Sequence, residues 1–211
     1  MAPIRIGLIG LSTNEDSLTS WAANAHLPYL KQSSKYAIVA LCNTSVEKAK
    51  ASIEKFGLSS STKTYGSPEE MAKDKDIDLA VCVTNVTTHY EILLPFIEAG
   101  MNCFTELPLA QDITKMRKLA SLAKEKGIRT CIGMQALPNP VVNVLKKTIA
   151  EGKIGKVLTS TFVGYGGVYN GTPRAEKFAQ LFKRSNGANM LTIWLLHCKS
   201  ERPSSSMLDL R

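Results

Sequence analysis

The chain has 211 residues, of which 44% are hydrophobic, and its formal net charge at pH 7 is +8. This length suffices for one large domain, or for one domain and part of another, and no apolar run approaches the roughly 20 residues of a membrane-spanning helix. No basic and apolar leader precedes the first strand, which argues against secretion. We therefore expect a cytoplasmic protein, with the nucleus as the alternative location.

The positive charge is concentrated in the last third of the chain, whereas the first two thirds are nearly neutral. Aromatic residues are not interleaved with the basic ones, as they are in a site for nucleic acid. A solvated basic face or tail accounts for this pattern. We therefore expect no direct nucleic-acid partner and no membrane association.

The five cysteines are an odd number. Four of them lie in strand-like runs and show no metal-ligand spacing: Cys42, Cys82, Cys103 and Cys131. Buried, reduced thiols in a cytosolic protein explain this distribution. We expect no metal site.

Predicted strands and helices alternate along the first part of the chain. Apolar runs predict strands at Ile4 to Thr13, Tyr36 to Asn43, Asp76 to Thr84, Met101 to Thr105 and Arg129 to Met134. Helices are predicted between them, near Ser17 to Leu30, from Thr44 to Phe56, after Ser67, from His89 to Ala99 and from Asp112 to Lys126. This alternation favours an α/β fold with a Rossmann-type, doubly wound parallel sheet, and continuous apolar strands fit burial on both faces.

The first strand ends in a turn of small residues that is a degraded dinucleotide fingerprint. Of the three glycines in G-x-G-x-x-G, Gly10 holds the first place, whereas Ser12 and Glu15 hold the second and third. Ser12 is small enough for the backbone to approach a pyrophosphate, but the charge of Glu15 would repel one. Two interpretations stay open: a cofactor turn that includes Leu11 and Thr13, and a strand that ends in glycine for steric reasons alone.

The end of the second strand carries no acidic residue. An acidic side chain there would bind the ribose hydroxyls of NAD and repel the additional phosphate of NADP. This chain has Asn43, Thr44 and Ser45, with Lys48 one turn further on, and this set favours NADP over NAD. Thr44 also fits the N-cap of the next helix, with Glu47 completing a capping box, and both interpretations can hold together.

Ligands of a doubly wound sheet bind beyond the carboxyl ends of its strands. Three strand ends carry candidate residues: Gly10 to Thr13, Thr84 to His89, and Glu106 to Pro108. We expect all three to converge on one crevice, where they enclose a pyrophosphate beside the N-terminal turn. This expectation does not depend on any single motif.

Thr84-Asn85 with His89, followed by Glu106-Leu107-Pro108, resembles the glucose–fructose oxidoreductase / inositol dehydrogenase / MocA family. The resemblance covers roughly residues 4–197, including Ala25 to Pro28 and Gly152 to Val157. The stretches that look most like the fungal branch of the family are Gly10 to Ser12, Thr88 to Tyr90 and Gly164 to Gly167. That branch contains a galactose-regulon repressor, which binds a nicotinamide dinucleotide and acts by binding a transcription activator.

The resemblance implies a dinucleotide-binding Rossmann domain over residues 1–135, followed by an α/β substrate and oligomerisation domain from residue 136 to 211. Members of the family usually oxidise a sugar or polyol by hydride transfer to NAD or NADP, and full-length relatives are expected to form homo-oligomers. The candidate cofactor-binding residues are Gly10, Leu11, Ser12, Thr13, Asn43, Thr84, Asn85, His89, Glu106 and Pro108.

Two positions bear on catalysis. In the family's Glu-Lys-Pro motif the lysine positions the substrate and takes part in proton transfer, but Leu107 stands there and has no proton to give. A later histidine commonly serves as acid or base, and His197 falls at the matching place, between flanks unlike the family. The resemblance thus implies a sugar or polyol oxidoreductase or, as the alternative, an inactive dinucleotide-binding transcriptional regulator. His89 matches a position near the nicotinamide or serves as a cap or packing group, and we expect His26 to be structural.

The second domain is expected to be truncated. Val157 to Tyr165 resembles the opening strand of the large sheet of the family, but the chain then reaches a polar tail at Pro203 to Ser206. A lone sheet strand leaves its edges and one apolar face exposed. We therefore expect residues 166–211 to be poorly ordered or held by a partner.

Overall fold

The computed structural model describes residues 2–14, 20–134, 139–159 and 161. These residues fall into two units, the first ending at Gly133 and the second beginning at Met134, and each is described by itself. None of the helices in these ranges is long and apolar enough to cross a bilayer.

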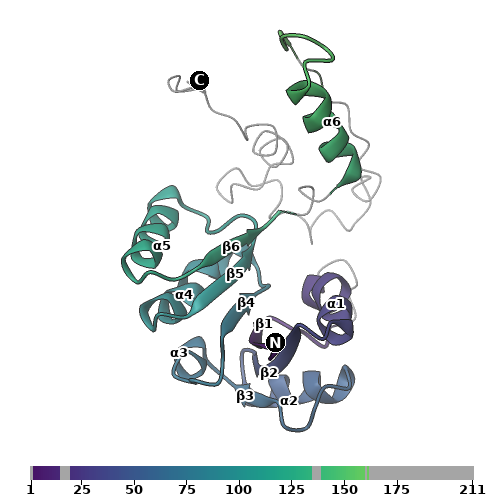
Figure 1. Cartoon of the computed structure of the whole chain (residues 1–211). Coiled ribbons are helices and arrows are strands. Elements are labelled where there is room, and N and C mark those ends of the chain that lie inside the picture. Colours follow the sequence, from purple (N-terminus) through teal and green to yellow (C-terminus); the bar gives the residue numbers. More distant parts are fainter. Residues whose placement is uncertain (1, 15–19, 135–138, 160, 162–211) are drawn as a thin grey trace, which may run out of the picture. The chain divides into compact units, whose positions relative to one another are not determined.

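The first unit is built on a six-stranded sheet in the order β3-β2-β1-β4-β5-β6 (Figure 1). Its strands are β1 (Ile4–Ile9), β2 (Tyr36–Cys42), β3 (Lys63–Tyr65), β4 (Leu79–Cys82), β5 (Asn102–Glu106) and β6 (Thr130–Gly133). Each neighbouring pair is parallel. Because the chain builds one half outward from β1 and then returns to place β4 on the other side, the sheet is doubly wound, and the predicted fold class is confirmed.

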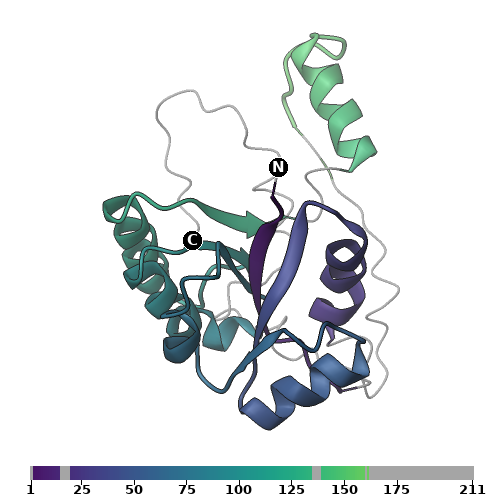
Figure 2. The same cartoon turned by 60° about the horizontal axis from the view of Figure 1, so that its bottom comes forward.

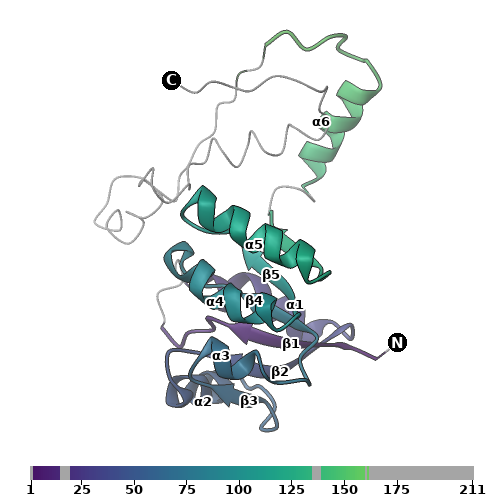
Figure 3. The same ribbon diagram turned by 90° about the vertical axis from the view of Figure 1, so that its left-hand side faces the viewer.

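Helices cover both faces of this sheet, as Figures 2 and 3 show from two further directions. On one face lie η1, a π-helical segment (Ala22–His26), α1 (Leu27–Gln32) and α2 (Val46–Lys55). On the other face lie α3 (Pro68–Met71), α4 (Val86–Glu98) and α5 (Ile113–Glu125). The strand ends lie between these two layers of helices.

Two apolar cores lie on opposite faces because side chains alternate along a strand. In β4, Ala80 and Cys82 belong to the core under α3, α4 and α5, whereas Val81 belongs to the core under α1 and α2. Phe96 of α4 and Leu41 of β2 are fully buried in these two cores. Burial on both faces explains why the strands are continuous apolar runs in the sequence.

Two predicted helix starts are wrong by one and three residues. Ser45, not Thr44, is the N-cap of α2, and its Oγ accepts a hydrogen bond from the backbone N–H of Lys48 at 3.3 Å. α4 begins at Val86 with Asn85 as its N-cap, rather than at His89. At the start of α5, the carboxylate of Asp112 accepts hydrogen bonds from two backbone N–H groups, so Asp112 caps this helix as predicted.

The structure also differs from the sequence prediction at β3. The predicted elements include no strand between Phe56 and Ser67, but Lys63–Tyr65 pairs with the end of β2 as the outermost strand. The first predicted helix is divided into η1 and α1, and residues 15–19, Glu15 among them, lie outside the described residues. The edge strand and the divided helix leave the sheet order unchanged.

In the second unit the structure describes the helix α6 (Pro140–Ala150), an addition to the predicted elements. Asn139 caps it by accepting from the N–H of Val141 at 2.9 Å, and Pro140 opens its first turn. Its apolar residues Val141, Val144, Leu145 and Ile149 are exposed. The predicted strand Val157 to Tyr165 lies largely outside the described residues.

Candidate functional site

The carboxyl ends of β1, β4 and β5 lie at one edge of the sheet. Ile9 of β1 is paired with Cys82 of β4, which is paired in turn with Thr105 of β5. Gly10, Thr84 and Glu106 end or follow these strands, so the three predicted strand ends do meet (Figure 1). Strand order reverses between β1 and β4, and doubly wound sheets open their ligand crevice at this point.

Gly10 sits between the ends of β1 and β4, and only glycine fits there. Its φ is +96°, and a Cβ atom on it would lie 2.3 Å from the carbonyl oxygen of Val83 and 2.8 Å from Cγ2 of Thr84. A side chain would therefore be strained by its backbone conformation and would collide with β4. The structure thus shows a steric reason for this glycine, which brings the turn after β1 against the end of β4, and the cofactor interpretation of the turn stays a prediction.

Polar side chains of α2 and of the residue that follows β2 hold the turn after Gly10 on its buried side. Leu11 is fully buried, and its carbonyl oxygen accepts hydrogen bonds from Nδ2 of Asn43 at 2.9 Å and from Oγ of Ser52 at 2.7 Å. Leu11 can therefore offer a ligand only its backbone, and the amide nitrogen of Asn43 is engaged inside the protein. The sequence analysis does not name Ser52 as a site residue. The pattern that could have identified it is a serine on the buried face of α2, three residues after Ala49.

The outer side of the same turn carries exposed hydroxyl groups. Ser12 and Thr13 are both exposed. Oγ of Ser12 accepts from the backbone N–H of Asn14 at 3.1 Å, and the ammonium of Lys55 donates to the carbonyl oxygen of Thr13 at 2.7 Å. These contacts shape the turn and leave hydroxyl hydrogens that can be donated to a phosphate oxygen.

The end of β2 presents a cation and a hydroxyl group side by side. Nζ of Lys48 lies 3.0 Å from Oγ1 of Thr44, and both residues are exposed. The carboxylate of Glu47 lies nearby on the same turn, where hydrogen bonds from its own backbone N–H and from Ser45 hold its pKa below the usual value. The charge of Lys50 also lowers the pKa of Glu47.

The end of β4 is closed by the first turn of α4. The side chain of Asn85 accepts from the backbone N–H of Thr87 at 3.1 Å. The hydroxyl of Thr88 donates to the carbonyl oxygen of Asn85 at 2.8 Å, and its oxygen also lies within hydrogen-bond distance of Oγ1 of Thr84, at 3.0 Å. Thr84 is half-buried and Asn85 is exposed, so Asn85 has the larger surface for a ligand.

His89 is only 1% exposed and joins two strand ends. Its Nδ1 lies 2.9 Å from the carbonyl oxygen of Pro108, and its Nε2 lies 3.1 Å from the carbonyl oxygen of Thr84. The hydroxyl of Thr105 is 3.5 Å from Nδ1. The packing interpretation of His89 fits this geometry, because both ring nitrogens face protein atoms and almost no surface remains for a ligand.

Glu106 is paired with a histidine that the sequence suggested to be structural. Nε2 of His26 lies 2.6 Å from Oε1 of Glu106, and the two side chains are 21% and 13% exposed. The ring of His26 also makes an edge contact with Phe104, with ring centroids 5.6 Å apart. On β6, a Cβ atom at Gly133 would lie 3.1 Å from Oε1 of Glu106 and 2.8 Å from Phe104. Glu106 is therefore held between η1 and β6.

The groups that could transfer protons at this edge are engaged within the protein. Leu107, which stands where the family's motif has lysine, is half-buried between Glu106 and Pro108. His26, His89 and Glu106 each have a protein partner. The candidate acid or base His197 lies outside the described residues. The described edge therefore has groups suited to binding, and its titratable side chains serve to hold it together.

A family model described as the oxidoreductase family with an NAD-binding Rossmann fold, GFO_IDH_MocA, matches residues 4–134. The chain belongs to this oxidoreductase family. A second model, described as the C-terminal domain of Gal80p, matches residues 140–200. The predicted family is therefore confirmed, together with its NAD-binding character.

Fungal proteins are among the most similar members of the family. The galactose/lactose metabolism regulatory protein GAL80 of Saccharomyces cerevisiae is 29% identical over 203 residues, which are 93% of this chain and 46% of that protein. The dehydrogenase aclE of Aspergillus oryzae is also 29% identical, over 90% of this chain and 51% of its own. The solved structure of a super-repressor mutant of Gal80p from S. cerevisiae matches with a TM-score of 0.75 and 28% identity, over 93% of this chain and 51% of that one. The chain spans about half the length of these relatives.

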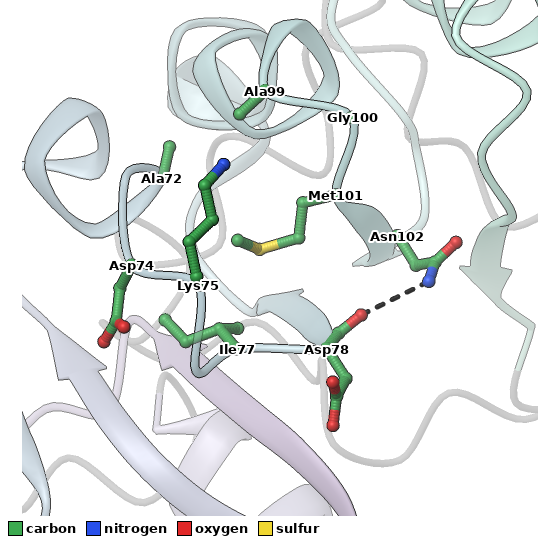
Figure 4. Close-up of a pocket in the computed structure, with 9 residues that line it drawn as sticks. All are labelled: Ala72, Asp74, Lys75, Ile77, Asp78, Ala99, Gly100, Met101 and Asn102. Atoms are coloured by element: carbon green, nitrogen blue, oxygen red, sulfur yellow. Dashed lines mark hydrogen bonds between the residues drawn. The ribbon is translucent and has the colours of Figure 1, made fainter.

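The first unit also has a cavity of about 290 Å³ at the amino ends of the strands. Figure 4 shows its lining, with Asp78 and Asn102 at the starts of β4 and β5 and Gly100 at the end of α4. Asp78 is paired with Arg5 at 2.8 Å, and its carbonyl oxygen accepts from Asn102 at 3.3 Å. This cavity is at the opposite end of the strands from Gly10, Thr84 and Glu106.

The prediction of buried thiols is right for three of the four cysteines and wrong for the fourth. Cys42, Cys82 and Cys103 are buried, and Cys131 is exposed because it lies on the edge strand β6. Burial raises the pKa of Cys42 and of Cys103 to about 12. Among the described residues, no group of histidine, cysteine or acidic side chains has the arrangement of a metal site.

Proposed function

We propose that this chain binds a nicotinamide dinucleotide at the carboxyl edge of the sheet and that it is a cofactor-sensing regulator rather than a dehydrogenase. The observation that supports it is the meeting of three strand ends at the point where strand order reverses. Gly10 brings the turn after β1 within contact of Val83 and Thr84, and β5 delivers Glu106 beside them. This is the place at which such sheets bind dinucleotides.

The residues present fit each part of that ligand. The hydroxyls of Ser12 and Thr13 are exposed on the turn that would face the pyrophosphate. Lys48 with Thr44 would meet the adenosine ribose, where a lysine suits the phosphate of NADP. Asn85 and the turn from Glu106 to Pro108 would border the nicotinamide, which supplies a hydride acceptor when bound. The exposed side chains named here are thus neutral or positive, with the acidic Glu47 beside them.

The state of the titratable groups supports regulation over catalysis. Proton transfer needs a side chain that is free to reach the substrate, whereas His89 is buried and His26 is committed to Glu106. Leu107 adds no proton-transferring group. Similarity to a galactose/lactose metabolism regulatory protein over 93% of the chain points the same way. The partner we propose is a transcription activator, which the chain would bind through an acidic segment of that activator. Binding would take place in the cytoplasm or the nucleus.

The second candidate function is a dehydrogenase that oxidises a sugar or polyol. Similarity to a fungal protein named as a dehydrogenase favours it. His197 would then be the acid or base, and residues 136–211 would be the start of the substrate domain that follows the dinucleotide-binding residues 1–135. Full-length proteins of either kind would be homo-oligomers.

A thermal-shift titration of the purified chain with NADP and NAD tests dinucleotide binding. A ligand at 100 times its dissociation constant stabilises the folded state by about 2.7 kcal/mol, so the melting temperature rises if the proposal is right. No shift with either dinucleotide at millimolar concentration would contradict it.

Two further assays separate the candidate functions. Absorbance of the reduced nicotinamide, followed with a panel of sugars and polyols, should show no turnover for the regulator, and turnover would establish the dehydrogenase. Pull-down with an acidic activator segment should depend on the added dinucleotide for the regulator. A full-length relative that turns over its substrate serves as the positive control for the first assay.

A further inference from the structure

The turn Glu106-Leu107-Pro108 is held from two sides by histidines that come from different helices. His26, at the end of η1, contacts the side chain of Glu106. His89, in the first turn of α4, contacts the main chain of Pro108. These helices lie on opposite faces of the sheet, so the turn is fixed from both layers.

The contact from His26 ties the turn to the segment that follows β1. η1 is packed on the sheet through Ala22, which lies in the same apolar core as Leu8 and Leu11. Nε2 of His26 and Oε1 of Glu106 lie 2.6 Å apart, a short hydrogen bond in which the ring N–H donates to the carboxyl oxygen when Nε2 carries the hydrogen. Because both side chains are largely buried, this bond resists competition from water better than a surface pair does.

His89 is packed between the turn and the end of β4. One ring nitrogen faces the carbonyl oxygen of Pro108 and the other faces that of Thr84. A carbonyl oxygen only accepts, so in either tautomer the ring donates a hydrogen bond to one of these two strand ends. The hydroxyl of Thr105 can donate to Nδ1 when that nitrogen is unprotonated. The imidazole thereby spans from Thr84 to Pro108.

We propose that His26 and His89 are positioning residues for the dinucleotide site, which fix the turn after β5 against the ends of β1 and β4 before the ligand arrives. This inference rests on the proposed dinucleotide binding. Neither histidine needs to touch the ligand, because each acts through a residue of the turn. A site assembled in advance pays less ordering entropy on binding, so loosening the turn weakens affinity.

The test is the dissociation constant of NADP, measured by calorimetry well below the melting temperature of each variant. His26→Leu removes the bond to Glu106, and we expect binding to weaken about tenfold, as for the loss of a hydrogen bond to a charged group. His26→Gln can still donate to the carboxylate, and we expect it to restore affinity to within about threefold of the wild type. Lys63→Met is the matched control, because it breaks a 2.7 Å ion pair with Asp76, which precedes the amino end of β4, and it should leave affinity unchanged.

A purely structural histidine would give a different result. His26→Leu would then lower the melting temperature and leave the dissociation constant of the folded protein unchanged, which would overturn the inference. If His26→Leu does not fold, Glu106→Leu removes the same bond from its other partner, and unchanged affinity would overturn the inference in that case too. Failure of the wild-type chain to bind NADP or NAD would instead remove the proposed function, and this inference with it.

Discussion

The ammonium of Lys48 lies 3.0 Å from the hydroxyl oxygen of Thr44, where the chain leaves β2 and enters α2. An acidic residue that would bind the ribose hydroxyls of NAD is lacking from Asn43 to Val46, so the position can accept a phosphate. We therefore expect the chain to bind NADP more tightly than NAD, and Lys48→Met to weaken NADP binding about tenfold through loss of a charge-assisted hydrogen bond. Calorimetric titration with both dinucleotides measures the effect.

The control for this prediction is Lys31→Met. This lysine, near the end of α1, donates to the carbonyl oxygen of Phe56 at 2.8 Å. Phe56 follows the last residue of α2, whereas Thr44 precedes the first residue of that helix. The substitution removes the same charge from the protein as Lys48→Met and should leave both affinities unchanged. Equal weakening of NADP and NAD by Lys48→Met would show that the lysine does not contact the additional phosphate.

Gly10→Ala should destabilise the first unit strongly. The new Cβ atom would lie 2.3 Å from the carbonyl oxygen of Val83, and the residue would keep a φ of +96°. Overpacking and backbone strain together cost about 3 kcal/mol or more. Gly57→Ala is the control, since its φ is +57° with no atom within 4 Å of the new Cβ, and it should cost only about 1 kcal/mol. Urea denaturation measures both, and equal losses would show that the contact with Val83 is unimportant.

Stability should fall in acid because aspartates at the start of β4 and α5 are stabilised as carboxylates. The guanidinium of Arg5 holds the pKa of Asp78 below its ordinary value of 3.8, and backbone N–H groups do the same for the pKa of Asp112. A lowered folded pKa contributes stability that is complete above the unfolded value and is lost as pH falls through the folded one. The unfolding free energy should therefore decrease below about pH 4. Since Asp78 is half-exposed, its share is small.

Asp78→Asn isolates the part of this acid response that belongs to the pair with Arg5. The variant should be less stable than the wild type at neutral pH, and the difference should shrink as the pH is lowered through the pKa of Asp78. Urea denaturation over a series of pH values gives both curves. A constant difference at every pH would mean that the carboxylate charge of Asp78 does not contribute.

Alkylation of the native chain should distinguish one cysteine of the first unit from the other three. Cys131 is exposed on β6, whereas Cys42, Cys82 and Cys103 are buried. Burial raises the pKa of each buried thiol and so removes the reactive thiolate. Peptide mapping after iodoacetamide treatment should find Cys131 modified and those three intact until urea is added. Rapid modification of Cys42 in the native protein would contradict the burial described.

The main strands were predictable because their side chains are buried on both faces, which leaves long apolar runs in the sequence. β3 was not, because Lys63–Tyr65 is short and half-exposed and becomes a strand only by pairing with β2. The cap of α2 could not be chosen from sequence either. Thr44 and Ser45 are adjacent hydroxyl residues, and only the path of the chain decides which one faces the helix.

The meeting of three strand ends was also predictable, since parallel strands share a carboxyl edge. The pairing of His26 with Glu106 was not, because the two residues are 80 positions apart and an isolated histidine has many possible partners. The burial of Ser52 beneath Leu11 likewise depends on how α2 lies against the first turn. Contacts that span helices and strands set the interior of the site, and they leave no local pattern in the sequence.

Hydrogen–deuterium exchange with and without NADP tests most directly where the ligand binds. Slower exchange is expected in three segments, 10–14, 84–88 and 106–107, which follow β1, β4 and β5. Protection centred instead on residues 74–78 and 99–102, which line the cavity at the opposite edge, or no change in any of these segments at saturating NADP, would contradict binding at the carboxyl edge.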